Sequence, residues 1–250
     1  STISDITISA GATTGTASFT PTDDSVYEGN ETGIVAIDTV SGGSATEDGT
    51  QSVTITITDN ESAPTVTLAT SATSIAENAG SSLTLTATLS NATTADVTVG
   101  ISTSGTGTEG TDYSTISDIT ISAGATTGTA SFTPTDDSVY EGNETGIVAI
   151  STVSGGSATE DGTQSVTITI TENESSPTVT LTTSATSIAE NSGSTLTLTA
   201  TISQAADEDV TVNLGAAGTS TNGTDYGSLS SITVSAGDTT GTATFDPTDD

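Results

Sequence analysis

Residues 83–89 read LTLTATL, a run in which apolar and polar side chains alternate at every position. Strict alternation predicts a β-strand with one face buried and the other in water. Clusters of Gly, Ser, Asn and Asp separate this run from others of similar kind, and no helical period occurs. We therefore expect an all-β fold, a seven-stranded immunoglobulin-like sandwich in roughly 110 residues. The six further runs lie at 66–68, 97–99, 119–121, 130–132, 147–150 and 166–170.

The chain of 250 residues repeats itself with an offset of 113 residues. Residues 1–37 recur unchanged at 114–150, and the offset then holds along the chain without an insertion. Near-identity within one chain indicates recent duplication of a single module. We therefore expect tandem sandwiches in a head-to-tail array.

Two prolines indicate the phase of the repeat. Pro64 and Pro177 each follow an acidic tripeptide and precede the strand-like run PTVTL. This predicts a complete unit at 64–176, with the C-terminal part of a unit at 1–63 and the N-terminal part of the next at 177–250. On this interpretation we expect the chain to be a segment of a longer protein. The alternative is a strand-exchanged polymer of successive chains, although the two partial units overlap in one strand.

The charge of the chain limits its partners. There are 32 acidic residues and no Lys, Arg or His, so the net charge is −32. Because nothing can neutralise a phosphate, nucleic acid and anionic membranes are excluded as electrostatic partners, and no apolar run suggests membrane insertion. The absence of Cys and His also removes thiolate and imidazole catalysis, and we expect no enzyme. The charge favours a cation as the partner.

The complete unit holds 13 acids, and eight of them lie at turn-like positions. Loops after alternate strands of an antiparallel sandwich share one end, and the segments 103–115, 134–144 and 172–174 all follow odd-numbered strands. We expect their acids to meet at one pole. The acid at 77 joins them there if the chain crosses the sandwich along its first strand before it reaches this residue. The eight acids are Glu77, Asp112, Asp136, Asp137, Glu141, Glu144, Glu172 and Glu174.

Converging carboxylates in a chain without bases would repel one another unless divalent cations bind between them. Oxygen-only ligands on loops favour Ca²⁺ over Mg²⁺, which requires tight octahedral geometry. The alternative is that surface acids only keep a filament soluble. The other acids of the unit are expected to be mostly solvated, with the pair at 160–161 the first candidates for a further role. They are Asp96, Glu109, Asp118, Glu160 and Asp161.

Three motifs together resemble the Calx-beta domain. They are SIAENAG at 74–80, the Gly-x-Asp-Tyr element at 110–113, and the acidic turn DDSVYEGNE at 136–144, with a closing acidic cluster after the last strand. The resemblance covers the whole chain and implies a seven-stranded sandwich with a multinuclear Ca²⁺ site at the pole, held by the eight acids. The closing cluster departs from the run of Asp often found there. The matching acids of the flanking units are Asp23, Asp24, Glu28, Glu31, Asp59, Glu61, Glu190, Asp225, Asp249 and Asp250.

Near-identical copies in series favour a structural function. We expect the repeat region of a secreted, calcium-stabilised extracellular filament or adhesin stalk, whose partners are calcium ions, neighbouring repeats and other copies in a filament. The lack of Cys suits a secreted bacterial protein. One alternative is an adhesive module that binds carbohydrate or a cell surface, which should expose Trp or Tyr. The other is a calcium sensor, which needs one or two switching domains and not an array.

Overall fold

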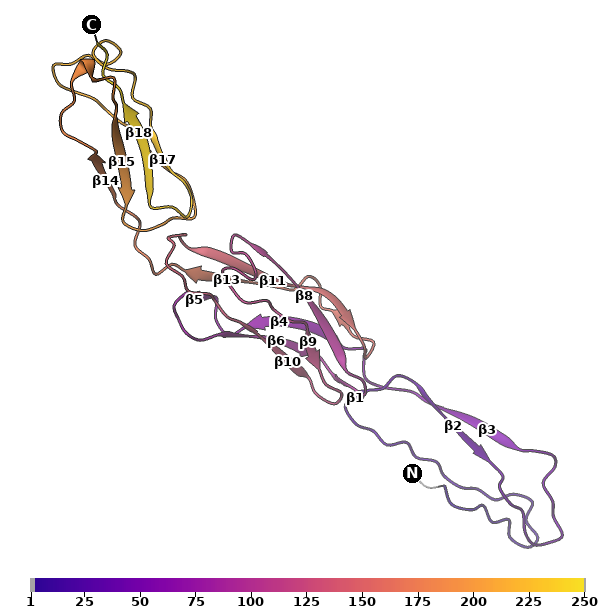
Figure 1. The fold of residues 1–250 in the computed structure, drawn as a ribbon. Coiled ribbons are helices and arrows are strands. Elements are labelled where there is room, and N and C mark those ends of the chain that lie inside the picture. The colour runs from indigo at the N-terminus through magenta and orange to yellow at the C-terminus, as the bar shows by residue number, and fades with distance from the viewer. Residues whose placement is uncertain (1–2, 250) are drawn as a thin grey trace.

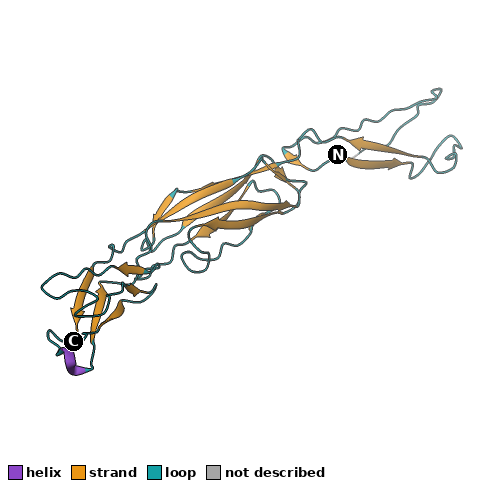
Figure 2. Ribbon diagram, turned by 90° about the horizontal axis from the view of Figure 1, so that it is seen from above, coloured by secondary structure: helices purple, strands orange, loops and turns teal. Residues whose placement is uncertain are grey.

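The structure, a computed structural model, describes residues 3–249. In two perpendicular views these residues form three modules that follow one another lengthwise (Figures 1 and 2). The only helix among them is the short 3₁₀ turn η1 (Glu190–Ser192). No helix in the described part of the chain is long and apolar enough to cross a bilayer.

The middle module is a sandwich of two β-sheets, which confirms the predicted fold. All seven predicted runs lie in its strands. One sheet has the order β10-β6-β4-β12 and the other β5-β13-β11-β8-β9. The first sheet contains β4 (Thr65–Thr70), β6 (Leu83–Leu89), β10 (Thr127–Phe132) and β12 (Thr159–Glu160). The second contains β5 (Ser74–Ala76), β8 (Val97–Gly105), β9 (Ile119–Ile121), β11 (Glu144–Ser154) and β13 (Ser165–Thr171).

The core of this module is a single apolar layer between the two sheets. Strand β6 buries its Leu and Ala side chains and leaves two of its three Thr side chains exposed, as the alternation predicts. At the end of β10, the buried Phe132 ring stacks on Tyr113 with 4.6 Å between ring centroids. This aromatic pair closes the core below the loops that carry the acids.

The chain changes sheet between β4 and β5. Strand β4 pairs antiparallel with β6, whereas β5 pairs in parallel with β13, with Ala76 opposite Thr171. The amide of Glu77 then donates to the carbonyl of Thr171 at 3.1 Å. The crossing therefore carries Glu77 to the end of the last strand, as the sequence analysis expects.

The flanking modules have fewer strands. The N-terminal module has a hairpin of β2 (Glu31–Ala36) and β3 (Ser52–Ile57), and its β1 (Val26–Tyr27) pairs with β7 (Ala92–Thr93) of the middle module. The C-terminal module has a sheet of β14 (Val179–Thr183), β15 (Leu196–Ile202) and β18 (Thr240–Phe245). A second pair consists of β16 (Val210–Val212) and β17 (Ile232–Val234).

Equivalent apolar residues differ in exposure between the modules. Ile119 is fully buried, whereas the matching Ile6 is 58% exposed and belongs to no strand. Leu68 is 7% exposed and its counterpart Leu181 is 53% exposed. The facing strands that cover these positions in the middle module have no counterparts among the described residues of the flanking modules.

Candidate metal centre

Two groups of three carboxylates lie at one pole of the middle module. Within each group the candidate ligand oxygens all lie within 4.8 Å of one another. Five of the six lie on the segments that follow β5, β8, β10 and β13, and Glu144 is the first residue of β11. This is the pole that faces the C-terminal module (Figure 1). The first group is Glu77, Glu172 and Glu174, and the second is Asp112, Glu141 and Glu144.

The Gly-x-Asp-Tyr element positions one of these carboxylates. Gly110 has a φ of +87°, and its amide donates to the carbonyl of Tyr113 at 2.7 Å. The carboxylate of Asp112 accepts the amide of Thr108 at 2.6 Å within the same turn. Since the ring of Tyr113 is buried on Phe132, the core anchors the turn that presents Asp112.

Glu172 connects the acidic turn to the tail that follows β13. One of its oxygens accepts the amides of Glu141 and Gly142 at 2.6 and 2.8 Å. The other accepts the amide of Glu174 at 2.9 Å. Gly142 has a φ of +77°, which helps turn two successive amides toward one oxygen. Asn143, which the sequence analysis does not single out, accepts the amide of Glu172 at 3.0 Å.

Asp136 and Asp137 belong to neither group but lie at the same pole. The amide of Asp137 donates to the carboxylate of Glu77 at 3.4 Å. The carboxylate of Asp137 contributes to the raised pKa of Glu141, and that of Asp136 to the raised pKa of Glu174. All eight acids that the sequence analysis places at one pole are therefore found there.

The pole holds several carboxylates away from their ordinary ionisation. Burial raises the pKa of Glu77, Glu141 and Glu144 to about 7, and neighbouring carboxylates add to the rise. Burial also acts to raise the pKa of Glu172. The backbone amides that donate to this carboxylate outweigh burial and hold its pKa below the usual value. The carboxylate of Glu172 favours the protonated form of Glu174, which can donate a hydrogen bond to it, and so raises the pKa of Glu174.

The donor set fits a hard divalent cation. One oxygen of Glu174 is buried and makes no hydrogen bond within residues 3–249. Glu77 is only 5% exposed, and the carboxylate bond described for it is the long contact with Asp137. Buried carboxylates normally have a base or several donors as partners, and this chain has no base.

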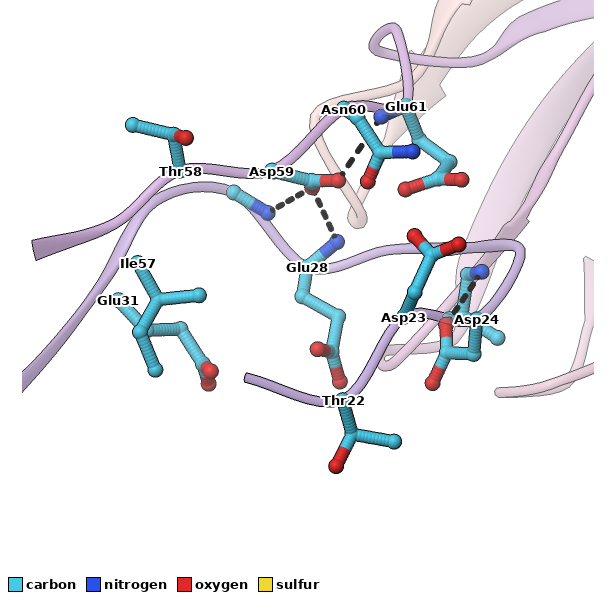
Figure 3. Close-up of a pocket in the computed structure, with 12 residues that line it drawn as sticks. Thr22, Asp23, Asp24, Glu28, Glu31, Ile57, Thr58, Asp59, Asn60 and Glu61 are labelled. Atoms are coloured by element: carbon cyan, nitrogen blue, oxygen red, sulfur yellow. Dashed lines mark hydrogen bonds between the residues drawn. The ribbon is translucent and has the colours of Figure 1, made fainter. Parts of the chain in front are cut away.

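The N-terminal module repeats the anchoring contact in a small cavity (Figure 3). Asp59 accepts the amides of Glu28 and Gly29 at 2.8 and 2.6 Å and that of Glu61 at 3.0 Å. These hydrogen bonds lower the pKa of Asp59 to about 2. No carboxylate group as tight as those of the middle module occurs among the described residues here. The cavity of about 40 Å³ is lined by all six predicted acids: Asp23, Asp24, Glu28, Glu31, Asp59 and Glu61.

The C-terminal module does not bring its predicted acids together in the part that is described. Glu190 is exposed in η1, because the strand that aligns Glu77 beside β13 has no counterpart among the described residues of this module. Asp225 accepts the amide of Thr221 and so keeps its local turn. Asp249 is exposed, and Asp250 lies outside the described residues.

Four of the five acids expected to be mostly solvated also brace turns. Each accepts a backbone amide through its carboxylate, and two of them, Glu109 and Glu160, are half-buried. Asp161 is exposed. The bonded pairs are Asp96 with Ala123, Glu109 with Ile116, Asp118 with Ile101, and Glu160 with Gln164.

Comparison with known proteins gives the class of this chain. The family model of the Calx-beta domain matches residues 2–61, 59–174 and 172–240, and the chain belongs to this family. It contains Calx-beta repeats in tandem. No curated protein sequence matches it.

Comparison with solved structures finds only a distant likeness. The apo form of the Calx CBD1 domain is 17% identical with a TM-score of 0.38, covering 44% of this chain and 99% of that one. CBD12 from CALX1.2 is 16% identical with a TM-score of 0.38, covering 72% and 74%. The calcium binding domain CBD12 of CALX1.1 is 15% identical with a TM-score of 0.35, covering 71% and 73%. The assignment to the family rests on the family model and not on these structures.

Proposed function

We propose that this chain is the calcium-stabilised repeat region of a secreted extracellular filament or adhesin stalk. The observation that carries the calcium proposal is the pole of the middle module. It combines two groups of carboxylates, of which Glu77 is only 5% exposed, with a buried oxygen of Glu174 that lacks a hydrogen-bond partner among residues 3–249. Loop carboxylates without nitrogen or sulfur ligands suit Ca²⁺ better than Mg²⁺. Membership of the Calx-beta family supports the same ion.

We assign the ligands to the eight acids of the middle module and to their copies. A bound cation would supply positive charge where three carboxylates have a pKa near 7, so that they ionise together. Glu172 would hold the turn and the tail in register around it. The ligands in the flanking modules would be Asp23, Asp24, Glu28, Glu31, Asp59, Glu61, Glu190, Asp225, Asp249 and Asp250.

The repeat unit that we propose is 64–176, flanked by parts of further units at 1–63 and 177–250. Near-identical copies in series support a structural function more than a sensor, which needs few switching domains. The lack of Lys and Arg leaves no cleavage site for trypsin-like proteases, which supports a location outside a bacterial cell. Fibres of uniform width in electron micrographs of the native material would support this function, whereas isolated beads would favour an adhesive module or a sensor.

The calcium proposal predicts a large effect of the ion on stability. If Ca²⁺ binds only the folded state, a thousandfold excess over Kd stabilises it by about 4 kcal/mol. Scanning calorimetry of the chain should show a clearly higher Tm in Ca²⁺ than in EDTA, with Mg²⁺ at equal concentration giving a smaller rise. Equal Tm values in Ca²⁺ and in EDTA would contradict the proposal.

A further inference from the structure

The two junctions between successive modules share a backbone contact. At the first junction, β1 of the N-terminal module pairs in parallel with β7 of the middle module. At the second, Tyr140 forms a parallel bridge with Ala206. The amide of Tyr140 donates to the carbonyl of Ala205 at 2.9 Å, and its carbonyl accepts the amide of Asp207 at 3.2 Å. We refer to this contact, at either junction, as the junction bridge.

The segment of the following module that forms the junction bridge also makes a hydrogen bond to the linker between the two modules. Asn91 donates through its side-chain amide to the carbonyl of Ser62 at 2.9 Å. At the next junction Gln204 donates in the same way to Ser175 at 2.6 Å. Ala206 itself is buried. At each of the two junctions, the following module therefore contacts both the linker and the acidic turn of the module before it.

The two junctions differ in two charges beside the junction bridge, because Asp207 and Glu208 of the second replace Thr94 and Ala95 of the first. Of these two acids, Asp207 is the one that acts on Glu141 and Glu144 of the acidic turn. Because the amide of Asp207 is bonded to the carbonyl of Tyr140, its carboxylate is carried close to Glu141, the next residue of the acidic turn. Burial and nearer acids raise the pKa of Glu141 and Glu144, and Asp207 of the following module adds to both. The neutral Thr94 has no such effect.

We propose that Asp207 makes the second junction bridge depend on a bound cation, whereas the first, with Thr94, forms with or without one. This inference rests on the proposed calcium site. Without a cation the carboxylate of Asp207 acts against those of Glu141 and Glu144 in a chain that has no base, and like charges drive the following module away. With a cation in the site, the same carboxylate is attracted to it. The acidic turn thus becomes a docking surface for an acid-bearing module only when the site is loaded.

The chain is well suited to a direct test, because it contains no cysteine. Pairs of introduced cysteines can carry spin labels without background. Thr54 and Thr120 span the first junction, and Thr167 and Thr233 span the second at equivalent repeat positions. All four are exposed strand residues. Pulsed electron-electron double resonance then measures the label distances of each junction in Ca²⁺ and in EDTA.

We expect the second pair to show a narrow distance peak in Ca²⁺ and to lose it in EDTA, while the first pair keeps its peak. Asp207→Thr should preserve the peak of the second pair in EDTA. Thr94→Asp should make the first pair lose its peak on chelation. Glu208→Gln removes the same charge from an adjacent position and is the matched control, expected to behave like the parent chain.

Persistent loss of the second peak in the Asp207→Thr chain on chelation would overturn the inference. Calorimetric titration of the same samples separates this failure from that of the proposed function. Intact Ca²⁺ binding with an unresponsive second junction overturns only the inference. Absence of Ca²⁺ binding in the parent chain overturns the proposed function and the inference together.

Discussion

At Asp137 a single substitution can separate the negative charge that a metal ligand supplies from the hydrogen bond that stabilises the turn. Its carboxylate accepts the amide of Val139, and asparagine can keep that bond while losing the charge. We expect Asp137→Asn to weaken Ca²⁺ binding about 10- to 100-fold with little change in the fold. Asp118→Asn is the control, because Asp118 braces Ile101 through a similar bond away from the pole. Isothermal titration calorimetry that finds equal losses for both would refute the ligand assignment.

The raised pKa values at the pole predict an unusual dependence on pH. Glu77, Glu141 and Glu144 titrate near 7 when folded and near 4.5 when unfolded, so between these values the folded chain binds more protons. Stability in EDTA should therefore fall as pH rises from about 5 to about 7. Ca²⁺ affinity should rise over the same window, because binding displaces protons.

Thermal unfolding at a series of pH values in EDTA measures this dependence. Replacing the three glutamates by glutamine should flatten the slope, which separates their effect from the general negative charge of the chain. The lowered pKa of Glu172 acts in the opposite direction but at lower pH. A Tm in EDTA that climbs from pH 5 to pH 7 would be inconsistent with the raised values.

At the scale of elements, identical sequences have different structures in this chain. Residues 127–132 form β10, whereas the identical residues 14–19 form no strand. Strand β10 exists because it pairs with β6 and caps the core with Phe132. An isolated strand has no partner for its backbone groups, so alternation alone is not sufficient.

This difference predicts unequal effects of one substitution at two identical sites. Phe132→Ala removes a fully buried ring stacked on Tyr113 and should cost about 3–5 kcal/mol. Phe19→Ala should cost much less, because Phe19 is only half-buried. Urea unfolding of the two variants compares them directly. Equal losses would mean that both copies pack in the same way.

At the scale of the whole molecule, the modules are aligned end to end (Figure 1). Only five residues separate Thr171 from Pro177, and two of them are Glu172 and Glu174. A linker of Gly and Ser with this length would be a flexible coil. Here the carbonyl of Ser175 is bonded to Gln204, and the proposed cation would fix the acids before it.

Small-angle X-ray scattering should therefore show an extended rod in Ca²⁺ and a smaller maximum dimension after chelation. A chain with Glu172→Gln and Glu174→Gln should resemble the chelated form even in Ca²⁺, whereas Asp118→Asn should not. The same maximum dimension in Ca²⁺ and in EDTA would show that calcium does not set the angle between modules.

The sequence was sufficient for the fold class, the repeat and the pole. Alternation predicts which side chains of a strand enter the core, because successive residues of a strand point to opposite faces. The strand order of a sandwich then places alternate loops at one end, which is why seven of the eight acids could be assigned to the same pole. Glu77 depended on the crossing of the chain to β13, which the structure shows. An acidic chain without a base left a cation as the partner that its charge favours.

Only the tertiary structure decided which of these elements have partners and what the acids contact. It separates β9 from the identical residues 6–8, and it shows that Glu172 binds backbone amides of the acidic turn. It also brings Asp207 of one module beside Glu141 of another. The physical reason is the same in each case. Local periodicity determines the direction of a side chain, whereas burial, hydrogen bonds and charge depend on which distant segment packs against it.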